Sequence, residues 1–503
     1  MLRSVNQITV NRIRVVFLVR FVLALTVASS AFAEDPKPDP PEEQIQDKSE
    51  STDDYYELLE VFVDSLDQIE RNYVKQISRR ELIEAAIDGM VDRLDAHSSY
   101  IPPKDVDQFR SSVESKFGGI GLHVAAQDGH IMVISPVVGA PAYSEGVLAG
   151  DRIVEIDGES TEGLSLDGAV RKLKGDVGTK VAITVQQGDK GKRRAITITR
   201  AMVRVDTILG TRRNPDDSWN FMHDEQQGIG YVRLNSFSRD TARDLRRVLM
   251  DLESKKLRGL VLDLRFNPGG LLTSAIEICD LFVSEGLIVS TKGRNTEERS
   301  WQAKTEGTFG DFPIAVLING YSASASEIVS ACLQDHDRAV VVGERSFGKG
   351  SVQNVIDLDD GNSVLKLTTA SYCRPNGHNI HRFDDAKDSD EWGVTPDADY
   401  EIKLSDDELK KLLVYRRDQY VVRGHPGTAS PSEDGPGDAT DTDDAKDGES
   451  GGDTDDAKDD TKDGSKDVDD SVDDGQPPEQ TPFEDRQLQK AFEYLSSELA
   501  RAE

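Results

Sequence analysis

The chain has 503 residues, a formal net charge of −33 and 30% charged residues. A chain of this length exceeds a single hydrophobic core, so two or three domains are expected. The acidic excess argues against nucleic acid as a partner, because phosphates would be repelled. Roughly half of the net charge lies in residues 431–480, so the folded part is only moderately acidic.

The N-terminus has the pattern of a secretory signal. Basic residues precede the apolar stretch VVFLVRFVLALTVASSAFA, which ends in the small-residue pattern Ala31-Phe32-Ala33. Arg20 interrupts this stretch and leaves an apolar run that is short for a membrane span. Residues 1–33 are therefore predicted to be a cleaved signal peptide, with an uncleaved anchor as the alternative. The mature protein is expected in the periplasm or cell envelope, with no integral membrane span.

A linker and a helical region follow the signal. Residues 34–54 are rich in Pro, Asp and Glu, which predicts a flexible linker. Residues 55–104 are predicted to form an N-terminal helical region, because apolar residues recur there at helical spacing: Leu58, Leu59, Phe62, Leu66 and Ile69.

The next segment changes to short strands and glycine turns. GGIGLHVAAQDGHIMVISPV predicts two strands around the turn Asp128-Gly129. A further strand, a short helix opened by Ser165 and a terminal hairpin follow. Residues 105–200 are therefore predicted to be a compact β-rich module.

Residues 201–415 alternate strands with helices. LRGLVLDLRFNPGG reads as a nearly all-apolar buried strand that runs into a glycine turn, and FPIAVLING reads as the next buried strand. The alternation predicts an α/β core with a largely buried sheet, which makes the whole chain a multidomain α/β protein. The three cysteines are too few for a disulfide framework and are predicted to be buried free thiols.

Two different segments close the chain. Residues 416–481 contain the near-repeats TDDAKDG and TDDAKDD and too few apolar residues to fold, which predicts an acidic disordered linker. Residues 482–503 return to helical periodicity. They are predicted to form a helix whose apolar face docks on the core or on another subunit.

The stretch GERSFGKGS (343–351) raises the question of what Lys349 does. It matches a phosphate-binding loop up to Gly350, which stands where Ser or Thr should bind magnesium. Such a loop must open a helix. The following residues are β-branched and predict a hairpin that turns at Asp360-Gly361. Nucleotide binding is therefore not expected.

Two other loops offer hydrolase chemistry. NGYSASASE (319–327) places three alternating serines at a strand-to-helix turn, and NPGG (267–270) exposes unhindered backbone N–H groups. A serine, a lysine base and a pair of amides suffice for acyl transfer. The structural alternative is that Ser324 and Glu327 only form a helix capping box. A triad through His336 is the catalytic alternative.

These loops, in this order, resemble the carboxy-terminal processing (tail-specific) serine peptidases with a PDZ domain, over roughly residues 55–415. The resemblance rests on DLRFNPGGLL, on FPIAVLINGYSASASEIVSACLQDHDRAVVVGERSFGKGSVQ and on GGIGLHV followed by GDRIVEIDG. It implies an exported endopeptidase with Ser324 as nucleophile and Lys349 as general base. Gln353 would orient the lysine.

The resemblance also implies an oxyanion hole formed by the backbone N–H groups of Gly270 and Ala325. Two positions depart from the family pattern: Phe266 stands where Asn is usual, and Tyr321 where Gly is common. Neither is a catalytic position, so these departures leave the shape of the substrate subsites in doubt.

The module at 105–200 would be the PDZ domain, with a carboxylate-binding loop formed by Gly119, Ile120, Gly121 and Leu122. The expected partners are polypeptide substrates with free C-termini, and neither a cofactor nor a metal is expected. Two alternatives remain: a catalytically silent PDZ scaffold that binds C-terminal tails, and a non-proteolytic hydrolase on the same core. Homo-oligomerisation is left open.

Overall fold

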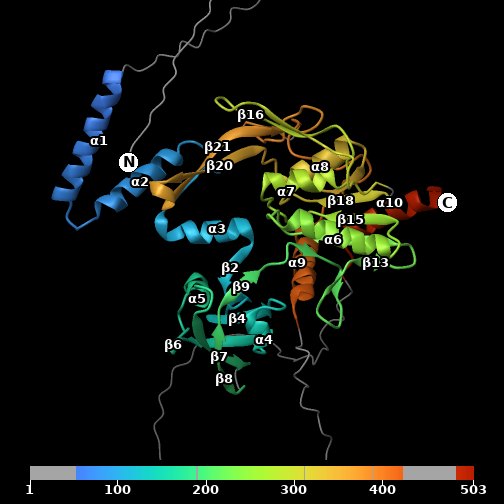
Figure 1. Cartoon of the computed structure of the whole chain (residues 1–503), viewed down its shortest axis with the longest axis horizontal. Helices are drawn as coiled ribbons and strands as arrows, with labels where there is room; N and C mark the ends of the chain where they lie inside the picture. The colour runs from blue at the N-terminus through green and yellow to red at the C-terminus, as the bar shows by residue number, and fades with distance from the viewer. Residues whose placement is uncertain are drawn as a thin grey trace, which may run out of the picture. The chain divides into compact units, whose positions relative to one another are not determined.

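The computed structural model describes residues 52–188, 191–310, 312–383, 385–387, 389–422 and 483–502. The predicted signal peptide, most of the linker and most of the acidic segment lie outside the described residues. The chain divides into two units, Met1–Ile77 and Ser78–Glu503 (Figure 1). No helix among the described residues is both long and apolar enough to cross a bilayer.

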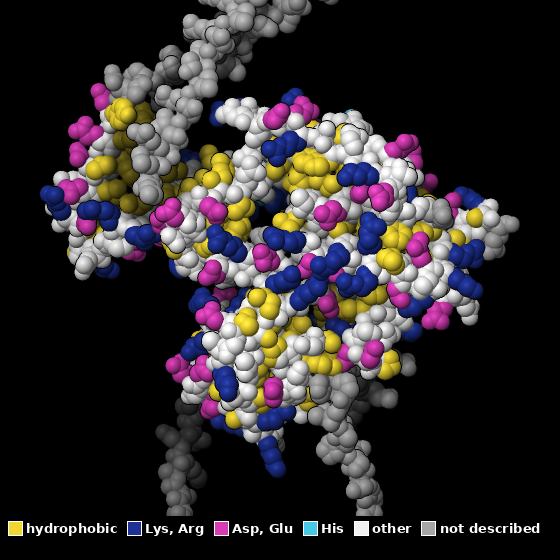
Figure 2. Space-filling model, viewed as in Figure 1, with side chains coloured by type: hydrophobic (Ala, Val, Ile, Leu, Met, Phe, Trp, Pro, Cys, Tyr) yellow, Lys and Arg dark blue, Asp and Glu magenta, His cyan; other side chains and the backbone are white. Residues whose placement is uncertain are grey.

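The first unit is described from helix α1 (Thr52–Asn72) onward, as the helical spacing predicted. Its apolar side chains are largely exposed, and hydrophobic side chains gather along α1 in Figure 2; they include Leu58, Leu59, Val61, Phe62 and Val63. Among the described residues of this unit, α1 therefore has no hydrophobic core that would stabilise it.

The second unit begins with α2 (Arg79–Val91), which Ser78 caps by accepting from the N–H of Glu81. A short strand β1 (Ser99–Ile101), a 3-10 turn (Pro103–Asp105) and α3 (Val106–Glu114) follow. The predicted helical region thus also contains a strand, which pairs antiparallel with a strand more than 250 residues later.

The predicted β-rich module is present. Its sheet has the order β3-β4-β5-β7-β8, with β6 on β5; the strands are β3 (Leu122–Gln127), β4 (His130–Pro136), β5 (Asp151–Ile156), β6 (Glu159–Ser160), β7 (Lys180–Gln187) and β8 (Arg193–Thr199). Helices α4 (Pro141–Ser144) and α5 (Leu166–Leu173) complete it. The predicted turn joins β3 to β4 with positive φ at Asp128 and Gly129. β2 (Lys116–Gly119) and β9 (Ala201–Arg204) pair at its base.

The α/β core is built on a largely parallel sheet of order β10-β14-β15-β18-β19, with β13 antiparallel on β14. The strands are β10 (Ile208–Leu209), β13 (Met222–Asp224), β14 (Ile229–Leu234), β15 (Gly259–Asp263), β18 (Ile314–Ile318) and β19 (Ala339–Gly343). Every residue of β14, β15 and β18 is buried, as the apolar runs predicted. A small ladder, β11 (Arg212–Arg213) with β12 (Trp219–Asn220), lies apart.

Helices cover both faces of this sheet. One face packs against α6 (Thr241–Ser254), α7 (Leu272–Asp280) and α8 (Ala325–Asp335). The other packs against α10 (Arg486–Ala502), drawn in red in Figure 1, through Ala491, Leu495 and Leu499. The predicted docking of the C-terminal helix on the core is confirmed. Arg486 also pairs with Glu408 in α9 (Asp406–Tyr420).

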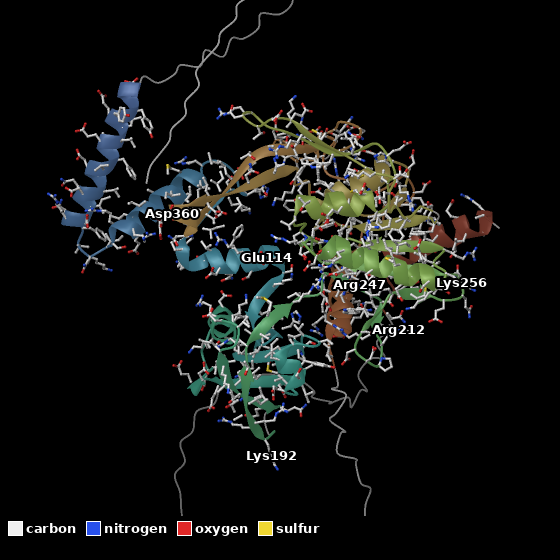
Figure 3. The ribbon with its side chains drawn as sticks, viewed as in Figure 1. Glu114, Lys192, Arg212, Arg247, Lys256 and Asp360 are labelled. Atoms are coloured by element: carbon white, nitrogen blue, oxygen red, sulfur yellow. The ribbon has the colours of Figure 1, made fainter. Side chains whose placement is uncertain are left out.

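A second sheet carries the lysine segment. Its order is β1-β21-β16-β17, with β20 on β21; the strands are β16 (Leu287–Lys292), β17 (Arg299–Gln302), β20 (Ser351–Leu358) and β21 (Ser363–Cys373). The predicted hairpin after Lys349 is confirmed, and Asp360 lies at its tip in Figure 3. Cys279 and Cys332 are buried free thiols as predicted, whereas Cys373 is only half-buried.

Candidate active site

The three serines of the turn between β18 and α8 differ in the contacts of their hydroxyl groups. Ser322 Oγ donates to the carbonyl oxygen of Leu264 at 2.9 Å, and Ser326 Oγ donates to that of Asn267 at 2.9 Å. These two buried hydroxyls fasten the turn to the loop after β15. The Ser324 hydroxyl makes neither contact; it lies near the phenol of Tyr372 on β21, whose pKa burial raises and Ser324 lowers.

The backbone of Ser324 is strained. Its φ is 56° and its ψ is −113°, and positive φ is uncommon for a residue with a side chain. The residue stands at the N-terminus of α8 and is 8% exposed. Its N–H donates to Oε2 of Glu327 at 2.7 Å, which is the capping contact that the sequence predicted.

The NPGG loop lies directly against this turn. Asn267 holds the loop, because its Nδ2 donates to Leu234 O and its Oδ1 accepts from Gly269 N, both at 2.9 Å. A Cβ added to Gly269 would lie 2.9 Å from the nitrogen of Ala325, so only glycine fits. Among the described residues, the N–H groups of Gly270 and Ala325 donate no backbone hydrogen bond. The structure therefore leaves two unused donors in adjacent loops.

Glu327 connects the serine turn to the lysine loop. Its carboxylate is fully buried, and Oε2 accepts from the backbone N–H of Ser324 at 2.7 Å and of Lys349 at 2.8 Å. Oε1 accepts from Ser346 Oγ at 2.5 Å and from Gly348 N at 2.6 Å. Burial raises the pKa of Glu327 to about 7, and the hydrogen bonds act in the opposite direction. The sequence identified only the capping contact.

Lys349 is half-buried beside this junction. Burial lowers the pKa of its amine, and the positive charge of Lys366 lowers it further, whereas Glu327 and Asp95 act in the opposite direction. Within the described part of the chain, no hydrogen bond joins the Lys349 amine to the Ser324 hydroxyl. The two groups are thus neighbours through their backbones but are not yet in contact through their side chains.

Gln353 has other partners than the lysine. Its Nε2 donates to Ser351 Oγ at 2.7 Å and to Thr368 Oγ1 at 3.3 Å, and Thr368 Oγ1 donates to Asp95 Oδ1 at 3.2 Å. Ser351 and Gln353 lie on one face of β20, since their side chains are hydrogen-bonded. Lys349 precedes the first residue of this strand, so the alternation does not extend to it.

The two positions that depart from the family pattern contact each other. The rings of Phe266 and Tyr321 are stacked with centroids 5.5 Å apart and an interplanar angle of 17°. Phe266 N donates to Asn319 Oδ1 at 3.0 Å, which ties the pair to the serine turn. Tyr321 also lines an open cavity of about 1010 Å³ beside the lysine loop, together with His97, Phe347, Gly348, His381 and Trp392.

His336 cannot complete a triad with Ser324. It follows the last residue of α8, whereas Ser324 precedes the first, and a helix of 11 residues separates these flanking positions by about 18 Å. His336 Nε2 is bonded to the carbonyl oxygen of Leu287 at 2.8 Å. The residue is half-buried, and Gly286 packs against its ring.

The predicted carboxylate-binding loop leads into β3. Ile120, Gly121 and Leu122 line a small pocket of about 40 Å³, closed on its other side by residues of α5. Gly119 instead ends β2, where it pairs with Ala201. Gly121 has φ of 77°, and a Cβ there would lie 2.3 Å from Cβ of Ala140. No side chain can therefore replace this glycine without distorting the module.

Family models match three parts of the chain. Residues 228–400 match Peptidase family S41, residues 132–187 match the PDZ domain, and residues 23–104 match the Activating protease CtpB N-terminal domain.

Individual relatives match this chain over most of its length. The chain is 39% identical to a carboxy-terminal-processing protease of Bartonella bacilliformis over 389 residues, which are 76% of this chain and 84% of the relative. It is 34% identical to carboxy-terminal processing protease CtpB of Bacillus subtilis over 316 residues, 62% of this chain and 64% of the relative. A solved photosystem II D1 C-terminal processing protease is 27% identical, with 68% and 92% coverage and a TM-score of 0.38. The chain belongs to the carboxy-terminal processing proteases of peptidase family S41, with a PDZ domain.

Proposed function

We propose that the protein is an exported serine endopeptidase in which Ser324 is the nucleophile and Lys349 the general base. One observation carries this proposal: a single oxygen, Oε2 of Glu327, accepts from the backbone N–H of both residues. The segments that bear the two groups are therefore fastened at one atom, although they lie on different sheets. If Ser324 and Glu327 only capped α8, Glu327 would not need to accept from Lys349 as well.

The reaction uses the groups around this junction. Neutral Lys349 accepts the proton of Ser324 Oγ, and the oxygen attacks the scissile carbonyl carbon. The N–H groups of Gly270 and Ala325 stabilise the negative charge on the former carbonyl oxygen. The lysine then protonates the leaving amine, and water hydrolyses the acyl-enzyme.

Two side chains must rotate before this step. The Ser324 hydroxyl turns from Tyr372 to the lysine amine, and Gln353 exchanges Ser351 for the same amine. Both changes are proposed to be rotations of the side chains about their own bonds. The lysine amine must be neutral to act as a base, and its burial lowers its pKa, which favours the neutral form.

The PDZ domain is proposed to select substrates by their free C-termini. The backbone N–H groups of residues 119–122 would surround the terminal carboxylate. β3 is an edge strand of its sheet, so an extended peptide can pair with it. The alternative is a catalytically silent scaffold that uses only this groove.

The test of catalysis is cleavage of an unfolded protein by the wild type, Lys349→Ala and Lys349→Arg. Both variants should be inactive while their far-ultraviolet circular dichroism is unchanged. A guanidinium stays protonated and cannot accept the serine proton. Cleavage by Lys349→Arg at the wild-type rate would contradict the role of the lysine, and an inactive wild type would favour the scaffold.

The test of selection compares a substrate that has a free C-terminus with its amidated form. The free form should be cut faster, and Lys174→Glu should reduce this preference, because Lys174 lines the groove directly after the last residue of α5. Equal rates for the two forms would contradict selection by the carboxylate. Export is tested separately, by sequencing the N-terminus of the mature protein, which should begin at Glu34.

A further inference from the structure

A second pocket lies where the PDZ domain, the parallel sheet and α9 meet. Its volume is about 450 Å³. Ile134 and Ser135 of β4 line it on one side, Arg233 of β14 on another, and Leu413 and Tyr420 of α9 on a third. The end of α9 is fixed there, because Ser135 Oγ donates to the carbonyl oxygen of Tyr420 at 3.1 Å. Neither the proposed catalytic step nor the PDZ groove uses this pocket.

Arg233 is the unusual member of this lining. Its side chain is buried, with the residue 2% exposed, and among the described residues neither Nε nor Nη2 has a hydrogen-bond partner. Its guanidinium lies over the ring of Tyr420, 5.3 Å from the centroid. A buried charged group without an acceptor is costly, and such groups in native proteins need an explanation.

Two other arginines that line this pocket are paired with carboxylates. Arg265 and Arg416 both donate to the buried carboxylate of Asp263, at 2.7 and 2.5 Å. Arg265 also donates to both oxygens of Asp485, at 2.9 and 2.8 Å. Arg265 and Arg416 therefore have carboxylate partners, whereas Arg233 has none among the described residues. A monoanion in the pocket would supply one.

The walls indicate the rest of the ligand. Their exposed surface is mainly apolar and comes from residues such as Ile134, Phe266, Leu413 and the ring of Tyr420, although Arg265, Arg416 and Arg417 also line the pocket. These three guanidinium groups already pair with carboxylates, so a dianionic phosphate would bring more negative charge than Arg233 alone offsets. A carboxylate on an apolar body satisfies both the charge and the walls, and the volume lies in the range of small-ligand sites.

We propose that this pocket binds the free C-terminal carboxylate of a short apolar peptide, with Arg233 as its charged partner. The proposal rests on the proposed function only in taking a peptide as the source of the carboxylate. The site differs from the PDZ groove, because neighbouring residues of β3 alternate between the two. His123 lines this pocket, whereas Leu122 and Val124 line the groove beside α5.

The test is calorimetric titration of the Ser324→Ala protein with N-acetyl-leucyl-alanine and with its C-terminal amide. The Ser324→Ala background removes cleavage, so binding is read independently of the proposed peptidase activity. The acid should bind about tenfold more tightly than the amide, and Arg233→Met should abolish this preference. The matched control is Arg501→Gln on α10, whose guanidinium pairs with Glu498 and does not line the pocket. It should change affinity less than about twofold.

Two further variants separate binding from folding. Arg233→Met should not lower the unfolding temperature, because it removes an unpaired buried charge. Leu413→Trp should reduce affinity by filling the mouth of the pocket while it keeps the arginine. An acid-over-amide preference retained in Arg233→Met would overturn the proposal, as would tighter binding of inorganic phosphate. Binding lost in Lys174→Glu but kept in Arg233→Met would assign the peptide to the PDZ groove.

The carboxylate could also come from the acidic segment that follows α9. Its side chains lack the apolar body that the pocket walls favour. The titration is therefore repeated on a variant that lacks residues 424–481. Equal affinity in both chains supports the peptide as ligand, whereas binding that appears only after the deletion would assign the pocket to the chain's own segment and overturn the proposal.

Discussion

The serine turn and the lysine loop are the two halves of the candidate active site, and they differ in how far they are organised. On the serine side, Ser322, Ser326 and Asn267 each hold the backbone by hydrogen bonds, and two N–H groups remain unused. On the lysine side, the backbone of Lys349 is fixed by Glu327, but its amine has no contact with Ser324. The proposed oxyanion donors are thus already held in place, whereas the proposed base would reach Ser324 only after a side-chain rotation.

The largest expected effect separates the middle serine from its neighbours. Ser324→Ala should reduce kcat/KM by about 10⁴-fold or more, because no nucleophile remains. Its unfolding temperature should stay near that of the wild type. The matched control is Ser326→Ala, which should keep measurable cleavage but lose about 1–3 kcal/mol of stability, because its buried hydroxyl only holds the turn. If both variants lost activity equally and neither lost stability, Ser324 would not differ from Ser326 in its role, which would contradict the proposal.

Glu327→Gln tests whether one buried carboxylate joins the two halves. The amide nitrogen cannot accept, so two of the four donors lose their partner, and we expect about a hundredfold loss of kcat/KM. The variant also changes the pH dependence of stability. The pKa of Glu327 is raised from 4.5 to about 7 in the folded state, so its stabilising contribution is full below pH 4.5 and is lost as pH rises through 7.

Chemical denaturation between pH 4 and 8 checks this sign. The decline in stability should be smaller in Glu327→Gln than in the wild type by the contribution of this one group. A variant with unchanged activity and an unchanged stability profile would show that the carboxylate does not join the two halves.

Gln353→Ala addresses the less organised half. If Gln353 turns to the lysine during the reaction, its loss should lower kcat by about tenfold and leave KM nearly unchanged. Thr368→Val is the comparison, since it removes the more distant of the two present partners of Gln353 and leaves only Ser351 to be exchanged for the lysine. It should keep or raise kcat. A reduction of equal size in both variants would mean that Gln353 acts only through the polar chain to Asp95.

The organised half was also the more predictable one. The apolar runs of β15 and β18 and the serine-rich start of α8 are local patterns, and they predicted the turn that carries Ser324. The hairpin after Lys349 followed from β-branched residues in the same way. The pairing of β1 with β21 and the four donors around Glu327 were not predictable, because they depend on segments far apart in sequence. The unpartnered burial of Arg233 has no local signal either.

The smallest expected effect concerns the histidine at the far end of α8. His336→Ala should change kcat/KM less than about twofold, since the imidazole is remote from the chemistry. It should lower stability slightly, because the hydrogen bond to Leu287 is lost. A large loss of activity in a folded His336→Ala protein would instead support a catalytic triad through His336 and contradict Lys349 as the base.

The pH profile of kcat/KM in the wild type and in Lys366→Met tests the role of Lys349 most directly. Activity should rise with pH as the lysine amine loses its proton. The positive charge of Lys366 lowers the pKa of Lys349, whereas the pKa of Glu327 is set by its burial and hydrogen bonds. Removing that charge should therefore move the midpoint of the rise to higher pH. A midpoint that stays in place or moves to lower pH would contradict Lys349 as the base.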